Sequence, residues 1–201
     1  MTVLPRNLPR KRLKDRDTII EAAAHRTRDA GFNGANMASI AQTANLSVGQ
    51  IYRHFENKEA IIEAIVERNA VEFARHIDSL RNQDGKLSSD LAAIFSTALH
   101  HKQREDWPSL RLEITAEASR NPRVAQIVRK AVDQERDHFL SLLSARCASV
   151  SDEATLLARY EILCMLFEGM SMRTVTSSRA SAPKVVELLE HLVTEIVDRT
   201  P

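Results

Sequence analysis

The sequence has few of the residues that end strands and build tight turns. Its 201 residues contain only five glycines and six prolines, and aromatic residues make up 4% of the chain. Sheet proteins with many hairpins need glycine and proline at their turns, so this scarcity favours helices joined by short connections. No stretch alternates convincingly between apolar and polar residues. We therefore predict an all-α protein of about nine helices.

Cysteines and long apolar runs are also scarce. The only two cysteines, Cys147 and Cys164, lie in segments that read as helices. A disulfide framework is therefore not expected, and both cysteines fit the role of small buried apolar residues. No apolar run approaches the roughly 18 residues that span a bilayer, and the N-terminal segment lacks the apolar stretch of a secretory signal. We expect a cytoplasmic protein with no membrane partner.

Patterns typical of enzymes and metal sites are weak. The nearest metal pattern is His100-His101 followed by Glu105, but adjacent residues of a helix point to different sides. We predict no catalytic residue, no metal ligand and no cofactor. Two alternatives stay open: a helical enzyme, which would turn over a bound ligand, and a helical adaptor, which would show no salt-dependent DNA binding.

Charge is distributed unevenly along the chain. Residues 1–58 hold ten Lys and Arg against five Asp and Glu, a net charge of +5, whereas the remainder has a net charge of −4. Residues 1–14 contain five basic residues, two prolines and no acid, which predicts a disordered basic arm, with a merely solubilising tail as the alternative. A basic front suits a polyanionic partner.

Helical periodicity divides the front half into four segments. We predict helices over residues 17–30, 37–44, 48–54 and about 57–80, with Gly31 ending the first and Asn36, Ser47 and Asn57 as N-caps. Asn45 can make the turn between the two short helices because asparagine tolerates a left-handed backbone. Two short helices and a tight turn, followed by a long helix, are typical of a helix-turn-helix.

The second short helix combines residue types that suit a DNA groove. Gly49 lets the backbone approach a phosphate, and Gln50 can form paired hydrogen bonds with adenine. Ile51 and Phe55 are four residues apart, so they can anchor one face of the helix to its own domain. The polar and cationic side chains that remain to meet DNA are Tyr52, Arg53, His54 and, at the start of the next helix, Lys58.

These residues form a pattern that resembles the tetracycline-repressor (TetR) family of transcription regulators. The resemblance covers residues 17–66, in "IIEAAAHRTRDAGF" and "NMASIAQTANLSVGQIYRHFENKEAII". Residues 113–124, "EITAEASRNPRV", are more weakly similar to members with a BetI- or UidR-like C-terminal half. The resemblance implies a DNA-binding domain over residues 15–60 and a ligand-binding and dimerisation domain over residues 61–201.

The resemblance also implies a function. It indicates a regulator, most simply a repressor, that binds a palindromic double-stranded operator as a homodimer and is released by a small molecule. By position, the DNA-binding set is Asn36, Ser39, Ser47, Val48, Gly49, Gln50, Tyr52, Arg53, His54 and Lys58. We expect the ligand near Phe95, Trp107, Arg111, Phe139 and Phe167, and the dimer seam along helices 122–147 and 153–174.

Two positions depart from the family pattern. Asn45 occupies the turn position where the family usually has glycine, and left-handed tolerance makes this exchange harmless. Arg26-Thr27 replaces a Leu-Phe pair that usually points into the core. We therefore expect the DNA-binding head to be less well packed than is usual for the family.

Overall fold

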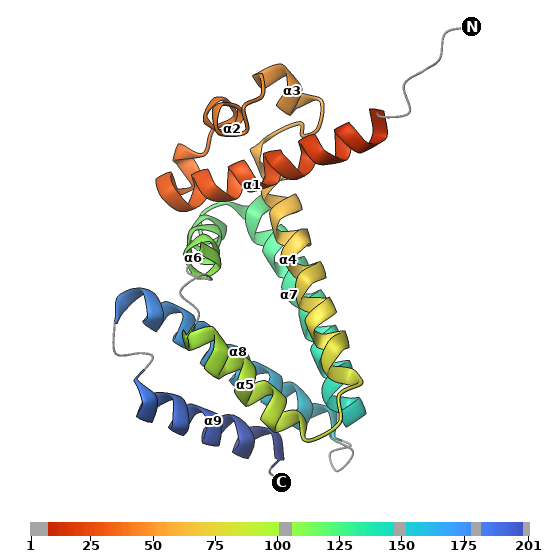
Figure 1. Cartoon of the computed structure of the whole chain (residues 1–201), viewed down its shortest axis with the longest axis vertical. Coiled ribbons are helices and arrows are strands. Elements are labelled where there is room, and N and C mark those ends of the chain that lie inside the picture. The colour runs from red at the N-terminus through yellow and green to blue at the C-terminus, as the bar shows by residue number, and fades with distance from the viewer. Residues whose placement is uncertain (1–7, 101–105, 147–151, 178–181, 199–201) are drawn as a thin grey trace, which may run out of the picture. The chain divides into compact units, whose positions relative to one another are not determined.

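The computed structural model describes residues 8–100, 106–146, 152–177 and 182–198. Within these ranges the chain forms nine α-helices and no strand, which confirms the predicted fold class (Figure 1). None of these helices is both long enough and apolar enough to cross a bilayer. Cys147, His101 and Glu105 lie outside the described residues. The helices are α1 (Leu8–Gly34), α2 (Met37–Thr43), α3 (Val48–Tyr52), α4 (Lys58–Arg81), α5 (Leu87–His100), α6 (Asp106–Ala118), α7 (Pro122–Arg146), α8 (Glu153–Thr176) and α9 (Pro183–Asp198).

The chain divides into two compact units. Met1–Arg68 with Leu110–Arg129 forms one, here called the head unit, and Asn69–Ser109 with Lys130–Pro201 forms the other, the body unit. The boundary predicted at residues 60 and 61 follows sequence order alone. Residues 110–129 join the head unit instead, where apolar side chains such as Ile114 and Val124 are buried.

The first helix begins earlier than predicted. It starts at Leu8 rather than near Asp17, so residues 8–14 are helical and do not form the disordered arm predicted over residues 1–14. Arginine, lysine and leucine all have high helix propensity, and Pro9 is tolerated in a first turn. Gly31 has a left-handed φ of 69°, which interrupts the helix where the sequence predicted its end.

The caps and the turn of the helix-turn-helix agree with the sequence. The Asn36 side chain accepts a hydrogen bond from the Ser39 amide at 2.9 Å, and that of Asn57 accepts one from the Ala60 amide at 2.8 Å. Asn45 has a φ of 53°, the left-handed conformation predicted for the turn. These local interactions set the boundaries of three consecutive helices.

The head unit has an isoleucine-rich core. Figure 1 shows α2 and α3 on one side of α1, and α2 packs against both neighbours. The largest fully buried side chains of the head unit include Ile19, Ile20, Ile40, Ile51, Ile61, Ile62 and Ile65. The first four helices, α1 to α4, therefore share one apolar core.

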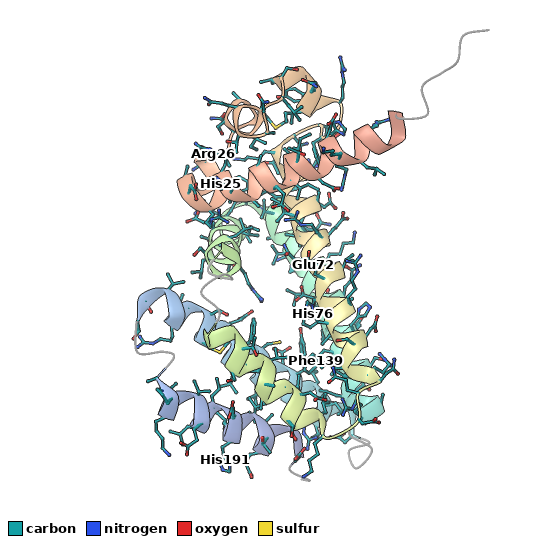
Figure 2. All side chains as sticks on the ribbon, viewed as in Figure 1. His25, Arg26, Glu72, His76, Phe139 and His191 are labelled. Carbon is teal, nitrogen blue, oxygen red and sulfur yellow. The ribbon has the colours of Figure 1, made fainter. Side chains whose placement is uncertain are left out.

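Arg26-Thr27 places polar atoms inside this core. Thr27 has 0% exposure, and its hydroxyl has no hydrogen-bond partner among the described residues. The Nε of Arg26, which is labelled on α1 in Figure 2, is likewise buried without a partner there. An unsatisfied buried hydroxyl destabilises a fold by about 1–3 kcal/mol. The cost at these two positions therefore comes from buried polar atoms without partners, and the expected looser packing of the head stays a prediction.

The body unit is built around α5, α8 and α9. These three helices pack against one another, as Figure 1 also shows. Its core joins residues of α5, α8 and α9 to the second halves of α4 and α7. Polar contacts also hold the end of α9: buried Arg159 donates to the Val197 carbonyl at 2.9 Å, and Asp198 accepts from Ser88 at 2.9 Å and lies 3.7 Å from the Lys86 ammonium.

Candidate DNA-binding site

A reciprocal cap holds the start of α3. The Gln50 amide donates to the Ser47 hydroxyl at 3.2 Å, and the Gln50 side-chain oxygen accepts from the Ser47 backbone amide at 2.9 Å. The Ser47 hydroxyl also donates to that oxygen at 2.9 Å. The Ser-x-x-Gln spacing is the signature of a capping box and was visible in the sequence. Sequence reasoning assigned Gln50 only to adenine, whereas its oxygen has this structural role.

The anchoring face of α3 points inward as predicted. Ile51 is completely buried and Phe55 is 5% exposed. The opposite face is open: Tyr52 is 55% exposed and Val48 is 39% exposed. The other exposed members of the predicted set are Ser47, Gly49 and Arg53, whereas Gln50 and His54 are half-buried. This geometry gives α3 one fixed face and one free face, which is what a helix inserted into a groove requires.

Gly49 has no structural reason to be glycine. A Cβ built at this position meets no atom within 4 Å, and the residue does not have a positive φ. Glycine in a helix is less stable than alanine by roughly 0.5–1 kcal/mol. Packing within the described chain therefore gives no reason for a glycine on the exposed face of this five-residue helix.

Lys58 makes two contacts within the head unit that the sequence did not predict. Its ammonium donates to the Phe32 carbonyl at 2.8 Å and lies 3.7 Å from the centre of the Phe32 ring. Burial lowers the pKa of Lys58, and the nearby carboxylates of Glu59 and Glu117 oppose that shift. In this structure the side chain joins α4 to the end of α1, and its contact with a phosphate stays a prediction.

Asn36 and Ser39 sit at the start of α2. Asn36 is exposed and caps the helix, whereas Ser39 is half-buried. The Ser39 hydroxyl lies 2.9 Å from the carbonyl oxygens of both Gly34 and Asn36, to which it can donate. Both side chains therefore stabilise the helix start, and a phosphate contact would be an additional role.

The structure brings together three of the five predicted ligand residues. Phe95 and Phe139 belong to the core of the body unit and partly buried Phe167 packs against it. The rings of Phe95 and Phe167 meet edge to face with centroids 5.6 Å apart. Phe139, labelled on α7 in Figure 2, adjoins two further rings, those of Phe73 and Tyr160. Arg111 belongs to the head unit, and the side chain of Trp107 lies outside the described part of the chain.

The comparisons with known proteins agree with this geometry. Residues 19–65 match the sequence model of a family described as "Bacterial regulatory proteins, tetR family". The HTH-type transcriptional regulator UidR of Escherichia coli (strain K12) is 31% identical over 118 residues, which is 57% of this chain and 57% of UidR. This chain therefore covers less than two thirds of that relative.

Solved structures share the whole fold. Salmonella enterica GusR superposes with a TM-score of 0.80 at 21% identity, covering 93% of this chain and 97% of GusR. FadR from Bacillus subtilis, in complex with stearoyl-CoA, superposes with a TM-score of 0.71 at 16% identity, covering 92% of this chain and 99% of FadR.

The family match begins in the buried face of α1 and ends in α4, so it contains the whole helix-turn-helix. The matched family is one of bacterial regulatory proteins, and UidR is described as a transcriptional regulator. Over residues 19–65, which include the free face of α3, this chain therefore resembles the TetR family of bacterial regulatory proteins.

Proposed function

We propose that this protein is a sequence-specific DNA-binding repressor that binds a palindromic operator as a homodimer and is released by a small-molecule effector. The exposed face of α3 enters the major groove, where Tyr52 and Arg53 contact the duplex. His54 and the amide group of Gln50 lie at the edge of that face. A repressor of this kind acts in the compartment that contains its DNA operator.

Gly49 is the observation that carries the proposal. Glycine weakens α3, and a Cβ at this position would meet no other part of the described chain, so the benefit of glycine is best explained by a partner. A phosphate or base edge that approaches the start of α3 would collide with a Cβ at this position. Glycine is selected at such places because it allows close approach of a backbone to a ligand.

The Gly49→Ala variant tests this function by two readouts of opposite sign. We expect stability to urea to rise by about 0.5–1 kcal/mol, because alanine has the higher helix propensity. Affinity for an operator selected from a random duplex pool should fall at least about tenfold, the effect of roughly 1.4 kcal/mol. Gln126→Ala, on an exposed position of α7, serves as a control that should change neither quantity.

A loss of stability in Gly49→Ala would show that the glycine serves the fold. Unchanged operator affinity would show that no ligand approaches the start of α3. Either result removes the support for the proposed site.

The exposed apolar residues of the body unit support a dimer seam on α8 and α9. On α8, Ile162, Met165 and Met172 are 45%, 66% and 52% exposed, and exposed Gly169 continues the same helical face. On α9 the exposed apolar residues are Val185, Leu188 and Leu192. Clustered exposed apolar side chains mark an interaction surface.

This seam differs from the pairing of helices 122–147 and 153–174 expected from the sequence. The exposed residues of α7 are mainly polar or charged, for example Arg129, Asp133 and His138. Two copies related by a two-fold axis can bury the exposed apolar residues of α8 and α9 against the same residues of the other copy. The two α3 helices of such a pair would contact two DNA half-sites that are one turn of the DNA duplex apart.

The aromatic cluster of the body unit is the proposed effector region. Phe95, Phe139 and Phe167 favour an apolar ligand, and the neighbour FadR is a precedent for a ligand with an acyl chain. An effector releases DNA only if it binds the DNA-incompetent conformation more tightly. Because α4 begins in the head unit and ends in the body unit, it is the candidate lever between the two functions.

A further inference from the structure

One face of α6 brings negative charge to the place where Lys58 is held. Lys58 donates to the Phe32 carbonyl at 2.8 Å, next to Gly31 near the end of α1. A Cβ built on Gly31 would lie 3.3 Å from Oε2 of Glu113, so α6 passes directly beside that part of α1. Glu117 is one turn farther along α6 and shares a face with Glu113. All of these residues belong to the head unit.

Glu117 is the buried member of the two acids. It is 7% exposed, whereas Glu113 is half-buried. Asn121 donates to Oε1 of Glu117 at 3.2 Å. Nη2 of Arg120 lies 2.7 Å from Oε2, but that buried oxygen has no hydrogen-bond donor among the described residues. A carboxylate that has lost its hydration in this way acts strongly on a nearby cation.

Lys58 is the nearby cation. Its ammonium has three donors, of which the Phe32 carbonyl accepts one, and it lies 3.7 Å from the centre of the Phe32 ring. Burial lowers the pKa of Lys58, and Glu59 and Glu117 are the carboxylates that oppose this shift. Glu59 is next to Lys58 in the sequence, whereas Glu117 comes from another helix. Only the charge of Glu117 therefore depends on how α6 packs in the head unit.

We propose that Glu117 is a positioning residue that restrains DNA binding, because its charge holds Lys58 inward against Phe32. A DNA phosphate would compete with this inward position for the same ammonium. The inference rests on the proposed function, since only a bound duplex supplies the competing phosphate. It gives a role to a buried carboxylate oxygen that has no donor of its own.

The test is a double-mutant cycle in the full-length protein. Glu117→Gln removes the charge and keeps an oxygen that can accept from Asn121, while Lys58→Met keeps the apolar stem of the lysine without its ammonium. Glu113→Gln is the matched control, because it removes one carboxylate from the same face of α6. The probe is a duplex that the wild-type protein selects from a random pool. Affinity is measured by fluorescence anisotropy at 150 mM KCl.

We expect Glu117→Gln to raise affinity for the selected duplex by about tenfold, which is within the range of coupling between neighbouring charged groups. A scrambled duplex should gain equally, since a phosphate contact carries no sequence information. In the Lys58→Met background Glu117→Gln should have no effect, because the ammonium is absent. Glu113→Gln should change affinity by less than about twofold.

Arg120→Gln gives a second test with the opposite sign. The Arg120 side chain is 55% exposed and partly neutralises Glu117. Its removal should strengthen the hold of Glu117 on Lys58 and lower DNA affinity by about threefold. The same change in the Lys58→Met background should leave affinity unaltered. This variant tests the inference even if Glu117→Gln does not fold.

Unchanged affinity in Glu117→Gln would overturn the inference. So would an equal gain in the Lys58→Met background, since the carboxylate would then repel DNA directly, or an equal gain in Glu113→Gln. A loss of affinity in Arg120→Gln that persists without Lys58 would also contradict it. Failure of the proposed function gives a different result: the wild-type protein itself would select no duplex, and the inference would fall with it.

Discussion

Replacing Thr27 by valine should stabilise the protein. Thr27 is completely buried in α1, and its hydroxyl has no hydrogen-bond partner among the described residues. Valine has nearly the same shape, with a methyl group in place of the hydroxyl, so the surrounding core need not move. Threonine and valine also have similar helix propensity. The difference between the two proteins therefore isolates the cost of burying one unpaired hydroxyl.

The expected gain is about 1–2 kcal/mol. An unsatisfied buried polar group costs about 1–3 kcal/mol, and partial relaxation in the threonine protein removes some of that cost. For a chain of 150–250 residues, each kcal/mol shifts the melting temperature by about 2–4 °C. Thr27→Val should therefore melt about 2–8 °C above wild type.

Urea unfolding and differential scanning calorimetry measure this gain. Thr18→Val is the control, because Thr18 lies on the same helix but is exposed, and its hydroxyl donates to the Lys14 carbonyl. The control should stay within about 0.5 kcal/mol of wild type. A loss of 1 kcal/mol or more in Thr27→Val would refute the reasoning, since it would mean that the buried hydroxyl has a partner such as an ordered water.

Two further predictions concern α4 and α8. Lys58→Ala should lower the free energy of unfolding by about 1–2 kcal/mol, because a charged hydrogen bond to Phe32 and a cation–π contact are both lost. If stability to urea were unchanged and DNA affinity fell, Lys58 would contribute only a phosphate contact. Met165→Asp should dissociate the proposed dimer in sedimentation velocity, whereas Val132→Asp on α7 should not. If Val132→Asp dissociated the dimer and Met165→Asp did not, the dimer seam would involve α7 instead.

Interactions between near neighbours in the sequence were the most predictable. The caps at Asn36 and Asn57 and the left-handed Asn45 each depend on residues within three positions. The residue types alone therefore determined them, and with them the helix-turn-helix. The inward face of α3 followed from the four-residue spacing of Ile51 and Phe55.

Interactions across the fold could not be predicted in the same way. Lys58 meets the carbonyl of Phe32, which is 26 residues earlier in the chain. Residues 110–129 join the head unit although they follow α5 in sequence. The apolar stripes of α8 and α9 stay exposed in one subunit, and periodicity does not distinguish a stripe that meets the core from one that meets a partner. Such choices depend on tertiary packing.

In the proposed function, the free face of α3 recognises a DNA sequence. Its most direct test is the ratio of affinities of the full-length protein for the selected palindromic duplex and for a scrambled duplex of the same length, at 150 mM KCl. We predict a ratio of at least about 10³, the lower end for specific DNA-binding proteins. A ratio near one, at this and at lower salt, would contradict the claim.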